Sequence, residues 1–497
     1  MKSVIPSGAA MGAISAAPGN TLPGAAGNAA SGSQQAASRH GAASIAARME
    51  RLPSAAYFWK IIVLVSLGGW FEFYDLIFTG YIAPGLAASG LLTTTTATFF
   101  GYTGIGGFIA ATFAGLFVGT FFCGRLADRY GRRAAFTWSM VWYSAASAFM
   151  AFQTTPEGLL IWRFVAGIGL GVEIVTVTTY IVELVPSHMR GKAVAFNQAI
   201  MFTAAPIAAL LAHWLVPQAP FGIDGWRWVV LLGSTGAIVV VFIRSALPET
   251  PRWLVQNGRA DDADRVVAGI EAKVARQSGR PLAEPVLKAE MPAPKAMPFL
   301  EMWTGPYRSR VVMLLVFNFF QAIGYYGFAN WVPTLLIAKG VLVTKSLLYA
   351  SAIAVASPIG PLLAMLVADR IQRKWLIVLS AGAIAVVGTL FSQTANPLLL
   401  VVLGVLINLC NSTLSLCYHT YQNEVFPTRI RARAAGVVYS FSRLGAMFSG
   451  FLIAFLLRNY GVNGVFAMIV GCMVIVMIAI GGFGPATNGK SLEELSH

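Results

Sequence analysis

Residues 124–133 read Gly124-Arg125-Leu126-Ala127-Asp128-Arg129-Tyr130-Gly131-Arg132-Arg133, a basic turn between two long apolar runs. A second apolar run ends in the similar stretch Ala368-Asp369-Arg370-Ile371-Gln372-Arg373-Lys374. Aligning Asp128 with Asp369 gives an offset of 241 residues (369 − 128), and the same offset takes Tyr180, Glu183, Pro186 and Arg190 to Tyr421, Glu424, Pro427 and Arg431. Because rare charged residues recur at one fixed spacing, the sequence indicates an internal duplication, with a period far longer than that of a solenoid repeat.

The composition is that of a membrane protein with many spans. Of the 497 residues, 57% are hydrophobic and only 11% are charged, which excludes a single soluble globule. The formal net charge is +15, but the basic residues gather in short clusters at the ends of apolar segments. That placement favours anchoring at a lipid bilayer over binding to nucleic acid. The four cysteines lie within or beside apolar runs and show no disulfide framework or zinc spacing, so we expect no metal site.

The chain is predicted to form two apolar halves joined by a charged loop. Residues 1–50 are mainly Ala, Gly, Ser and Asn and predict a disordered tail, in which Met11 and Met49 are alternative translation starts. A bilayer core about 30 Å thick needs about 20 apolar residues per helix. We expect six-helix bundles over 51–247 and 310–485, a central loop over 248–309 and a C-terminal tail over 486–497. Twelve segments meet the length, near residues 59–83, 99–123, 134–152, 159–181, 193–216, 227–247, 310–336, 346–367, 375–392, 397–419, 434–457 and 464–483.

The distribution of Lys and Arg predicts the orientation in the membrane. The loops after the second, fourth, eighth and tenth segments and the central loop are basic, whereas the loops between them carry few positive charges. Because basic loops stay on the cytoplasmic side, we expect both termini and the central loop to be cytoplasmic. The composition of the tail and the basic loops favour a bacterial inner membrane.

Three further stretches extend the pattern of the basic turn. Together with the duplicated turn, they resemble the major facilitator superfamily, in its sugar-porter-like branch, over residues 50–485. The resemblance implies an all-α membrane protein with twelve transmembrane helices in two six-helix parallel-repeat bundles, working as a monomeric carrier and not as an enzyme. The stretches read Arg163-Phe-Val-Ala-Gly167-Ile-Gly169-Leu-Gly171, Tyr180-Ile-Val-Glu183-Leu-Val-Pro186-Ser-His-Met-Arg190-Gly191 and Pro248-Glu249-Thr250-Pro251-Arg252-Trp253-Leu254.

Two details narrow the class of substrate that the resemblance implies. The run Trp70-Phe71-Glu72-Phe73-Tyr74-Asp75 and the lead-in Arg51-Leu52-Pro53 resemble members that carry nicotinate-like, aromatic or other small organic acids. Sugar porters usually have paired glutamines early in the seventh helix, where this chain reads Phe319-Phe320-Gln321-Ala322 and keeps one glutamine. We therefore predict proton-coupled symport of a small organic acid by alternating access. Sugar–proton symport, efflux of drugs or metabolites, and a membrane-embedded sensor are the alternatives.

Ionisable residues within apolar segments are candidates for coupling to protons. Each costs on the order of 2.5 to 3.5 kcal/mol to place at the centre of a membrane helix, so each needs a partner. Asp75 of the first segment and Arg163 of the fourth both fall in the outer half of the membrane, where their geometry allows an ion pair. We predict that Asp75 binds the coupled proton and thereby releases Arg163. Glu72, on nearly the same helix face, is the alternative proton site, and a static pair that only joins the two helices is the structural alternative.

The duplicated charges at the basic turns predict a gate. Opposite charges can pair across the seam between the two halves when the cytoplasmic mouth is shut, and in the family these motifs hold the outward-facing state. Simple anchoring by arginines accounts for the basic residues but leaves the duplicated glutamates unexplained. The gate residues are Asp128, Arg129, Arg132, Glu183 and Arg190 in the first half and Asp369, Arg370, Arg373, Glu424 and Arg431 in the second.

Polar or aromatic residues in the middle of apolar segments are candidates for a substrate cavity. Amide side chains that faced lipid would strand hydrogen-bond donors, so we expect them to line a polar site for an organic anion. Gln198 and Gln321 also match substrate positions of the family. Residues 484–491 fit the phosphate-loop pattern but lack its strand and helix, so we expect no nucleotide and no other cofactor. The cavity candidates are Tyr74, Asn197, Gln198, Asn318, Gln321, Tyr325, Asn408, Asn411 and His419.

Overall fold

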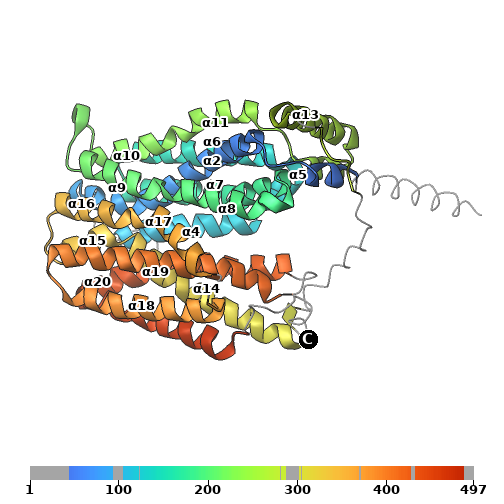
Figure 1. Ribbon diagram of the computed structural model, residues 1–497. Helices are drawn as coiled ribbons and strands as arrows, with labels where there is room; N and C mark the ends of the chain where they lie inside the picture. Colours follow the sequence, from blue (N-terminus) through green and yellow to red (C-terminus); the bar gives the residue numbers. More distant parts are fainter. Residues whose placement is uncertain are drawn as a thin grey trace, which may run out of the picture.

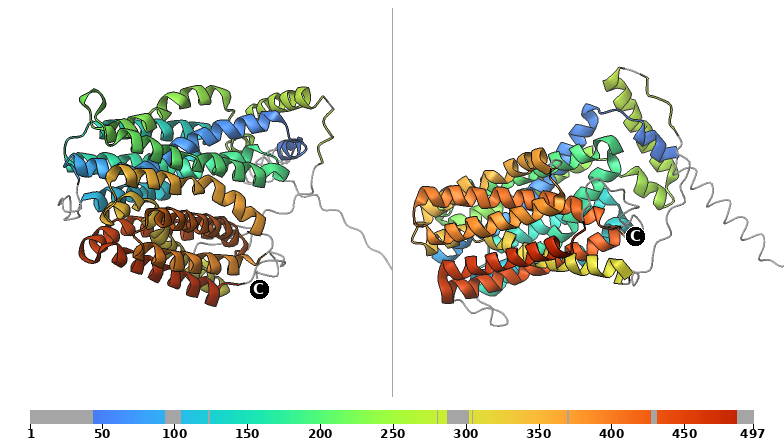
Figure 2. Two further views of the ribbon diagram at one scale, coloured as in Figure 1. Left: turned by 60° about the vertical axis from the view of Figure 1, so that its left-hand side comes forward. Right: turned by 60° about the horizontal axis from the view of Figure 1, so that its bottom comes forward.

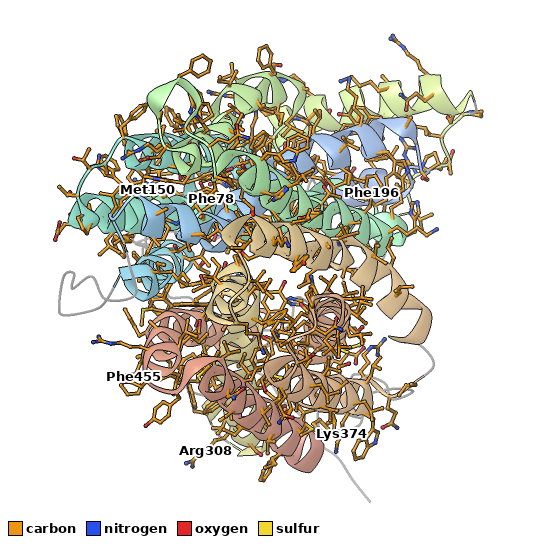
Figure 3. The ribbon with its side chains drawn as sticks, turned by 90° about the vertical axis from the view of Figure 1, so that its left-hand side faces the viewer. Phe78, Met150, Phe196, Arg308, Lys374 and Phe455 are labelled. Carbon is orange, nitrogen blue, oxygen red and sulfur yellow. The ribbon has the colours of Figure 1, made fainter. Side chains whose placement is uncertain are left out.

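The chain folds into two stacks of α-helices that run along a common direction (Figure 1). In Figure 1 the blue-to-green first half lies above the yellow-to-red second half. A view along the helices shows the same division, with Phe78 and Met150 in one half and Lys374 and Phe455 in the other (Figure 3). The computed structural model describes residues 44–92, 104–122, 124–279, 281–286, 302–303, 305–368, 371–426 and 431–485.

Within the described residues, the first half has six spans, two of them built from consecutive helices. The short helices α3 (Ala83–Ala88) and α5 (Gly124–Tyr130) lie at the ends of spans, and a 3₁₀ helix, Pro220–Gly222, precedes the last one. The spans are α2 (Ala56–Tyr81), α4 (Gly104–Phe122), α6 (Arg132–Ala151), α7 (Pro156–Leu184), α8 with α9 (Ser187–Phe202 and Ala204–Leu215), and α10 with α11 (Gly225–Ser234 and Gly236–Ala246).

The second half repeats this arrangement, and its last helix, 53 residues long, contains a break. Gly461 has φ 63° and ψ −163°, a backbone conformation open almost only to glycine, and it divides that helix into two spans. The helices are α14 (Gly305–Ala329), α15 (Val332–Ala338), α16 with α17 (Val343–Ala354 and Ala356–Ala368), α18 (Arg373–Gln393), α19 (Pro397–Glu424) and α20 (Arg431–Phe483).

Length and hydropathy agree with the predicted membrane spans. Among the described residues, ten helices are long and apolar enough to cross a bilayer. One of them, Ala434–Phe483, holds the two spans separated at Gly461, and the less apolar α6 occupies the place of the third predicted segment. The described helices therefore match the twelve predicted segments, and the predicted all-α membrane fold is confirmed.

Glycines let α4 and α7 approach each other closely within the first half. A Cβ atom on Gly115 would lie 2.1 Å from the carbonyl oxygen of Phe164, and one on Gly119 would lie 2.1 Å from that of Ile168. On the facing helix, Gly167 and Gly171 have the same four-residue spacing and contact the same stretch of α4. Membrane helices commonly associate through such pairs of small residues. Lipid provides no hydrophobic driving force for association, so close backbone packing stabilises the contact instead.

The two halves also meet backbone to backbone, at one end of the bundle. A Cβ atom on Gly80 of α2 would lie 2.2 Å from the carbonyl oxygen of Asn330, just after α14. Gly106 of α4 and Gly450 of α20 come equally close, since a Cβ on either would lie within 2.7 Å of the other's carbonyl oxygen. We call this the closed end; the end that carries Arg132 and the other duplicated charges is the basic end.

The central loop contains two helices at the basic end, α12 (Pro251–Gln256) and α13 (Ala260–Ser278). Helix α13 buries Ala263, Val267, Ile270 and Val274, which share one face at helical spacing. The first described helical segment, residues 44–50, lies beside α13 (Figure 2) and buries Ile45 and Met49. Residues 44–50 were expected to belong to the disordered tail, but they form a helix whose apolar side chains are buried beside the central loop. Residues 1–43 lie outside the described part.

Candidate transport site

A fully buried ion pair joins α2 and α7 inside the first half. Arg163 Nη1 donates to Asp75 Oδ1 at 2.5 Å, and neither side chain is more than 1% exposed. Nη2 donates to the Asp75 carbonyl oxygen (2.7 Å) and to Thr79 Oγ1 (2.6 Å), while Nε donates to Thr112 Oγ1 (2.8 Å). Ser147 Oγ donates to the second carboxylate oxygen at 2.6 Å. The predicted pair is present, and its hydrogen bonds connect α2, α4, α6 and α7.

The surroundings of this pair explain how two charges are tolerated in an apolar interior. Removing an ion from water costs several kcal/mol, and the cost is offset only when geometry and hydrogen bonding are good. Here both carboxylate oxygens accept a hydrogen bond, and Phe78 and Phe108 place ring centroids 4.8 and 5.8 Å from the guanidinium carbon of Arg163. The pair therefore stays favourable only while both partners keep their charges.

Two further carboxyl groups of the first half lack such partners. Glu72 of α2 is 1% exposed, and Glu173 of α7 is fully buried. One oxygen of Glu72 and both oxygens of Glu173 have no hydrogen-bond partner. Glu173 lies against α2, because a Cβ atom on Gly68 would come within 3.2 Å of its Oε1. Since Gly68 is one turn before Glu72, the two carboxyl groups lie along the same face of α2.

The second half holds a buried arginine of a different kind. Arg443 of α20 is 1% exposed. Its Nη1 donates to the hydroxyl of Tyr326 and its Nη2 to that of Tyr439, both at 2.9 Å, while Nε has no partner. The guanidinium carbon also lies 4.8 Å from the centroid of the Tyr439 ring. None of the ion pairs described in this structure includes Arg443, so its charge is held by two hydroxyl groups and an aromatic face.

Arg443 lies at the seam between the halves. The ring of Tyr326, which accepts from Arg443, packs against Phe113 of α4 with centroids 4.6 Å apart, and α4 belongs to the first half. The sequence analysis missed Arg443, although a lone arginine within the apolar segment 434–457 was a signal of the same kind as Arg163.

His419, a predicted cavity residue of the second half, packs beside Tyr439, which binds this arginine, and two more, Asn318 and Gln321, are buried on α14. Asn318 donates to the Leu314 carbonyl oxygen (2.7 Å), and its Oδ1 accepts from Tyr418. The ring of His419 packs between those of Tyr418 and Tyr439, with centroids 5.1 and 5.5 Å away. Gln321 is buried one turn after Asn318 on α14.

In the first half, α8 supplies two predicted cavity residues. Asn197 is buried; its amide nitrogen lies 3.3 Å from the sulfur of Met201, and its Oδ1 has no partner. Gln198 is half-buried. Tyr74 requires a correction, because its hydroxyl donates to the Val229 carbonyl oxygen of α10 at 2.9 Å inside the bundle. Its ring also contacts Gly233 of the same helix, so Tyr74 packs α2 against α10 and does not face the seam.

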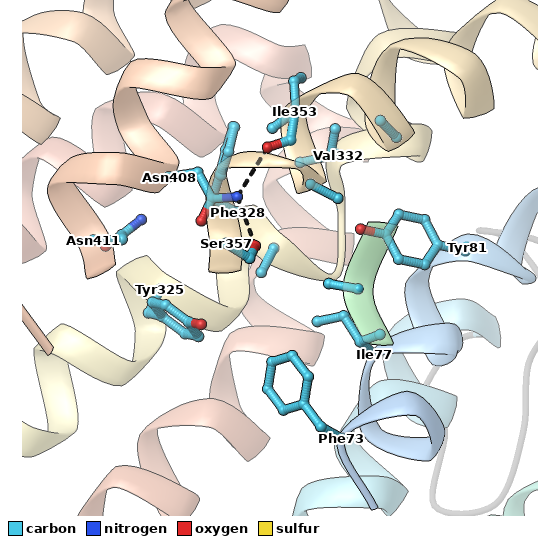
Figure 4. Close-up of a pocket in the computed structure, with 14 residues that line it drawn as sticks. Phe73, Ile77, Tyr81, Tyr325, Phe328, Val332, Ile353, Ser357, Asn408 and Asn411 are labelled. Carbon is cyan, nitrogen blue, oxygen red and sulfur yellow. Dashed lines mark hydrogen bonds between the residues drawn. The ribbon is translucent and has the colours of Figure 1, made fainter. Parts of the chain in front are cut away.

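A small cavity, about 30 Å³, lies at the seam between α2 and α9 of the first half and α14, α16 and α19 of the second (Figure 4). Tyr325 and Asn411, both predicted cavity residues, line it together with Phe73 and Tyr81 of α2. Asn408, also on its wall, donates to the Ile353 carbonyl oxygen (3.1 Å) and to the Ser357 hydroxyl (3.0 Å). A volume of this size holds one or two water molecules and no organic solute. Together with the backbone contacts at the closed end, this small volume indicates that the two halves pack tightly here.

At the basic end, the duplicated charges form the same pair in each half. Arg132 donates to Glu183 at 3.1 Å and to Asp128 at 2.6 Å, and Arg373 donates to Glu424 at 2.6 Å. Both arginine–glutamate pairs join residues 51 apart in sequence. These pairs lie within single halves, whereas the sequence analysis predicts pairing across the seam in a state with this end shut. Asp369 and Arg370 and the side chain of Arg431 lie outside the described residues.

At this end, Arg190 is joined to the N-terminal segment and the first turn of α6 to the central loop. Arg190 pairs with Glu50 at 2.9 Å, and Arg129 lies 5.4 Å from the centroid of the Tyr130 ring. The backbone N–H groups of Arg132 and Arg133, at the first turn of α6, both donate to Glu249, a favourable place for a carboxylate. Burial raises the pKa of Glu249, although these backbone hydrogen bonds oppose the shift. Thr250 Oγ1 donates to Glu183 at 2.7 Å, so the central loop joins the same network.

Comparison with known proteins decides the family. The family model described as "Sugar (and other) transporter" matches residues 61–497. The chain belongs to this family of the major facilitator superfamily. The fold agrees, because the xylose transporter XylE from E. coli, in a partially occluded inward open conformation, superposes with a TM-score of 0.70 at 19% identity, over 88% of this chain and 100% of that one.

Relatives of this superfamily member include carriers named for aromatic acids. The niacin transporter NiaP of Acinetobacter baylyi is 28% identical over 91% of this chain and 99% of its own length. The 4-hydroxybenzoate transporter PcaK of the same organism is 25% identical over 89% of this chain and 94% of its own. The family and these relatives are membrane transporters, which confirms the expectation of a carrier and not an enzyme.

Proposed function

We propose that the protein carries a small organic anion together with a proton across a bacterial inner membrane by alternating access. The proposal that the substrate is an anion rests on Arg443, a positive charge buried at the seam. Its Nε is unpaired, and its hydrogen-bond partners in the described residues are tyrosine hydroxyls. A guanidinium can donate two parallel hydrogen bonds to a carboxylate, and that bond is about twice as strong as one between neutral groups. A neutral sugar would leave the buried charge uncompensated.

The surroundings of Arg443 favour an aromatic or nicotinate-like acid. Tyr326 packs edge-on against Tyr325 with centroids 4.9 Å apart and against Phe113 at 4.6 Å, so aromatic walls stand beside the charge. Aromatic ligands pack well against such rings. The names of NiaP and PcaK support the same class of substrate. The polar residues that we assign to the substrate site are Asn197, Gln198, Asn318, Gln321, Tyr325, Asn411 and His419.

We assign proton coupling to the buried pair of the first half. Protonation of Asp75 would remove the charge that holds Arg163, and a guanidinium with weakened bonds to α2 lets α2 and α7 shift relative to each other. Asp75→Asn imitates the protonated carboxyl group. It should therefore abolish uptake driven by a proton gradient while leaving exchange of labelled for unlabelled substrate intact. Unchanged accumulation by this variant would remove Asp75 from the coupling mechanism.

We assign the basic end to the cytoplasm, with both termini and the central loop on that side. The duplicated charges are assigned to the gate. Support comes from the backbone contacts between the halves at the closed end and from the basic-end ion pairs that lie within single halves. Such an arrangement fits a conformation open toward the basic end. When the cycle reverses, Glu183 and Glu424 would exchange partners across the seam and hold this end shut.

Uptake into proteoliposomes tests the proposal. An imposed pH gradient, acidic on the side of entry, should drive accumulation of labelled nicotinate or 4-hydroxybenzoate but not of xylose. Arg443→Gln should abolish binding of the acid, measured on purified protein, whereas Arg458→Gln, a charge change at an exposed position of the same helix, should leave it intact. Accumulation of xylose by the wild type, or acid binding that survives in Arg443→Gln, would refute the proposed substrate class.

A further inference from the structure

We propose that residues 44–52, here called the strap, hold the gate residue Arg190 while the basic end is open and must release it before that end shuts. The inference rests on the proposed function, since it takes Arg190 as part of the gate. The strap precedes the part of the chain that the family model matches, which begins at residue 61, so the match assigns the strap no role.

The strap contacts Arg190 through Glu50, at the start of α8. Glu50 Oε1 accepts from Arg190 Nη2 at 2.9 Å, and its Oε2 accepts from the backbone N–H and the hydroxyl of Ser187 at 2.9 and 2.5 Å. Ser187 is the first residue of α8, where the helix dipole favours a negative charge. The side chains of Glu50 and Arg190 are 37% and 40% exposed. Ion pairs this accessible to water contribute little to stability, so this contact can break at low cost.

Stronger contacts anchor the strap to α13. Glu271 accepts from Arg48 Nε and Nη2 at 3.1 and 2.7 Å, a two-bond geometry, and from Arg51 Nη2 at 2.6 Å. The three side chains are between 13% and 19% exposed, and Leu52, at the end of the strap, is fully buried. Parallel hydrogen bonds between charged groups are stronger than single ones, and burial shields them from water. We therefore expect the strap to stay on α13 when its pair with Arg190 breaks.

The strap and the gate compete for the same guanidinium. The contacts described above join the strap to α8 of the first half and to α13 of the central loop. A gate contact requires Arg190 to pair with an acid of the second half, such as Glu424, which in this conformation accepts from Arg373 within its own half. Because the pair with Glu50 is made while the basic end is open, it favours that conformation, and its loss favours closure.

Distances between spin labels on the two halves test this competition. Ser245 of α11 and Ser309 of α14 are exposed at the basic end, one in each half, and can be changed to labelled cysteines once the four native cysteines are replaced by alanine. A long distance reports the open basic end and a short one the shut end. Glu50→Gln should raise the ratio of short to long distances by about two- to fivefold, the change expected for loss of an exposed ion pair.

Asp264→Asn is the matched control, since it removes another exposed acidic partner of the strap but leaves Glu50 and Arg190 in place. It should not change the ratio. In an Arg190→Gln background, Glu50→Gln should have no further effect, because the competition is gone. An unchanged ratio in Glu50→Gln alone, or an equal shift in the Arg190→Gln background, would overturn the inference. The distances are measured without substrate, so failure of the uptake assay would refute the proposed substrate class separately.

Discussion

The pair of Asp75 and Arg163 predicts two variants that differ in the pH dependence of their stability. In Asp75→Asn the guanidinium stays buried without a counter-charge, and arginine cannot release its proton. Breaking a buried pair in this way costs about 3–5 kcal/mol. The amide oxygen can still accept from Arg163, and the bonds to Thr79 and Thr112 remain, so the lower part of this range applies. None of these groups titrates near neutral pH, so the cost should not change with pH.

In Arg163→Met the carboxyl group has another way to lose its charge, because it can bind a proton in the folded protein. The unfolded chain releases that proton above the range where an exposed aspartate titrates. Each further pH unit therefore costs the folded variant about 1.4 kcal/mol relative to the unfolded chain. At neutral pH the total is about 4 kcal/mol, close to the cost for Asp75→Asn, whereas at mildly acidic pH it falls to about 1–2 kcal/mol.

Thermal or denaturant unfolding of both variants in the same detergent, across a pH series and relative to the wild type, measures this difference. Stability of Arg163→Met should rise as the pH falls, while that of Asp75→Asn should follow the wild type at a constant offset. Equal pH slopes for the two variants would refute the reasoning. The double variant should cost less than the sum of the two single changes, because neither partner is then left with an unpaired charge.

Gly115→Ala places a methyl group 2.1 Å from a backbone carbonyl of α7 and should destabilise the protein by about 1–3 kcal/mol in thermal unfolding, whereas Gly471→Ala, with open space around it, should have no such cost. Burial raises the pKa of Glu271, but its hydrogen bonds and ion pairs with Arg48 and Arg51 together outweigh burial and leave that pKa below 4.5. Docking of residues 44–50 on α13 is then complete above pH 4.5 and weakens as the pH falls through the lowered pKa, which spin-label distances between the two would show. Glu183→Gln should slow uptake several-fold without weakening substrate binding, measured in the same proteoliposomes; weaker binding would contradict a role in the gate.

The sequence predicted the features that depend on periodicity and repetition. Apolar length located the spans, and the fixed offset identified Arg132 with Glu183 and Arg373 with Glu424 as equivalent residues, which form equivalent pairs. The pair of Asp75 and Arg163 could be predicted because buried charges in membrane helices need partners.

Side-chain direction could not be predicted in the same way. Tyr74 is one residue before Asp75 on α2, yet it points toward α10, because adjacent residues on a helix point about 100° apart. Arg443 was missed because its partners are tyrosine hydroxyls, which leave no charge pattern in the sequence. Its importance depends on a contact between helices of different halves, and a one-dimensional pattern carries no information about that contact.

The duplication also shows where the two halves differ in their buried residues. Arg163 and Thr112 are 51 residues apart and hydrogen-bonded; the 241-residue offset takes them to Gly404 and Ile353, which are equally spaced. In the second half the same helix contact is apolar, since a Cβ atom on Gly404 would lie 2.4 Å from Ile353 Cδ1. Conversely, Arg443 corresponds to Phe202 in the first half.

The two buried arginines therefore occupy positions that are not equivalent, on a scaffold whose gate residues are equivalent. In the proposed cycle, equivalent gates let two similar halves rock about one seam, opening one end as the other closes. The proposed symport also needs different sites for the anion and the proton. Placing the paired arginine inside the first half and Arg443 at the seam in the second meets this requirement, since the proposed proton and substrate sites then lie in different halves.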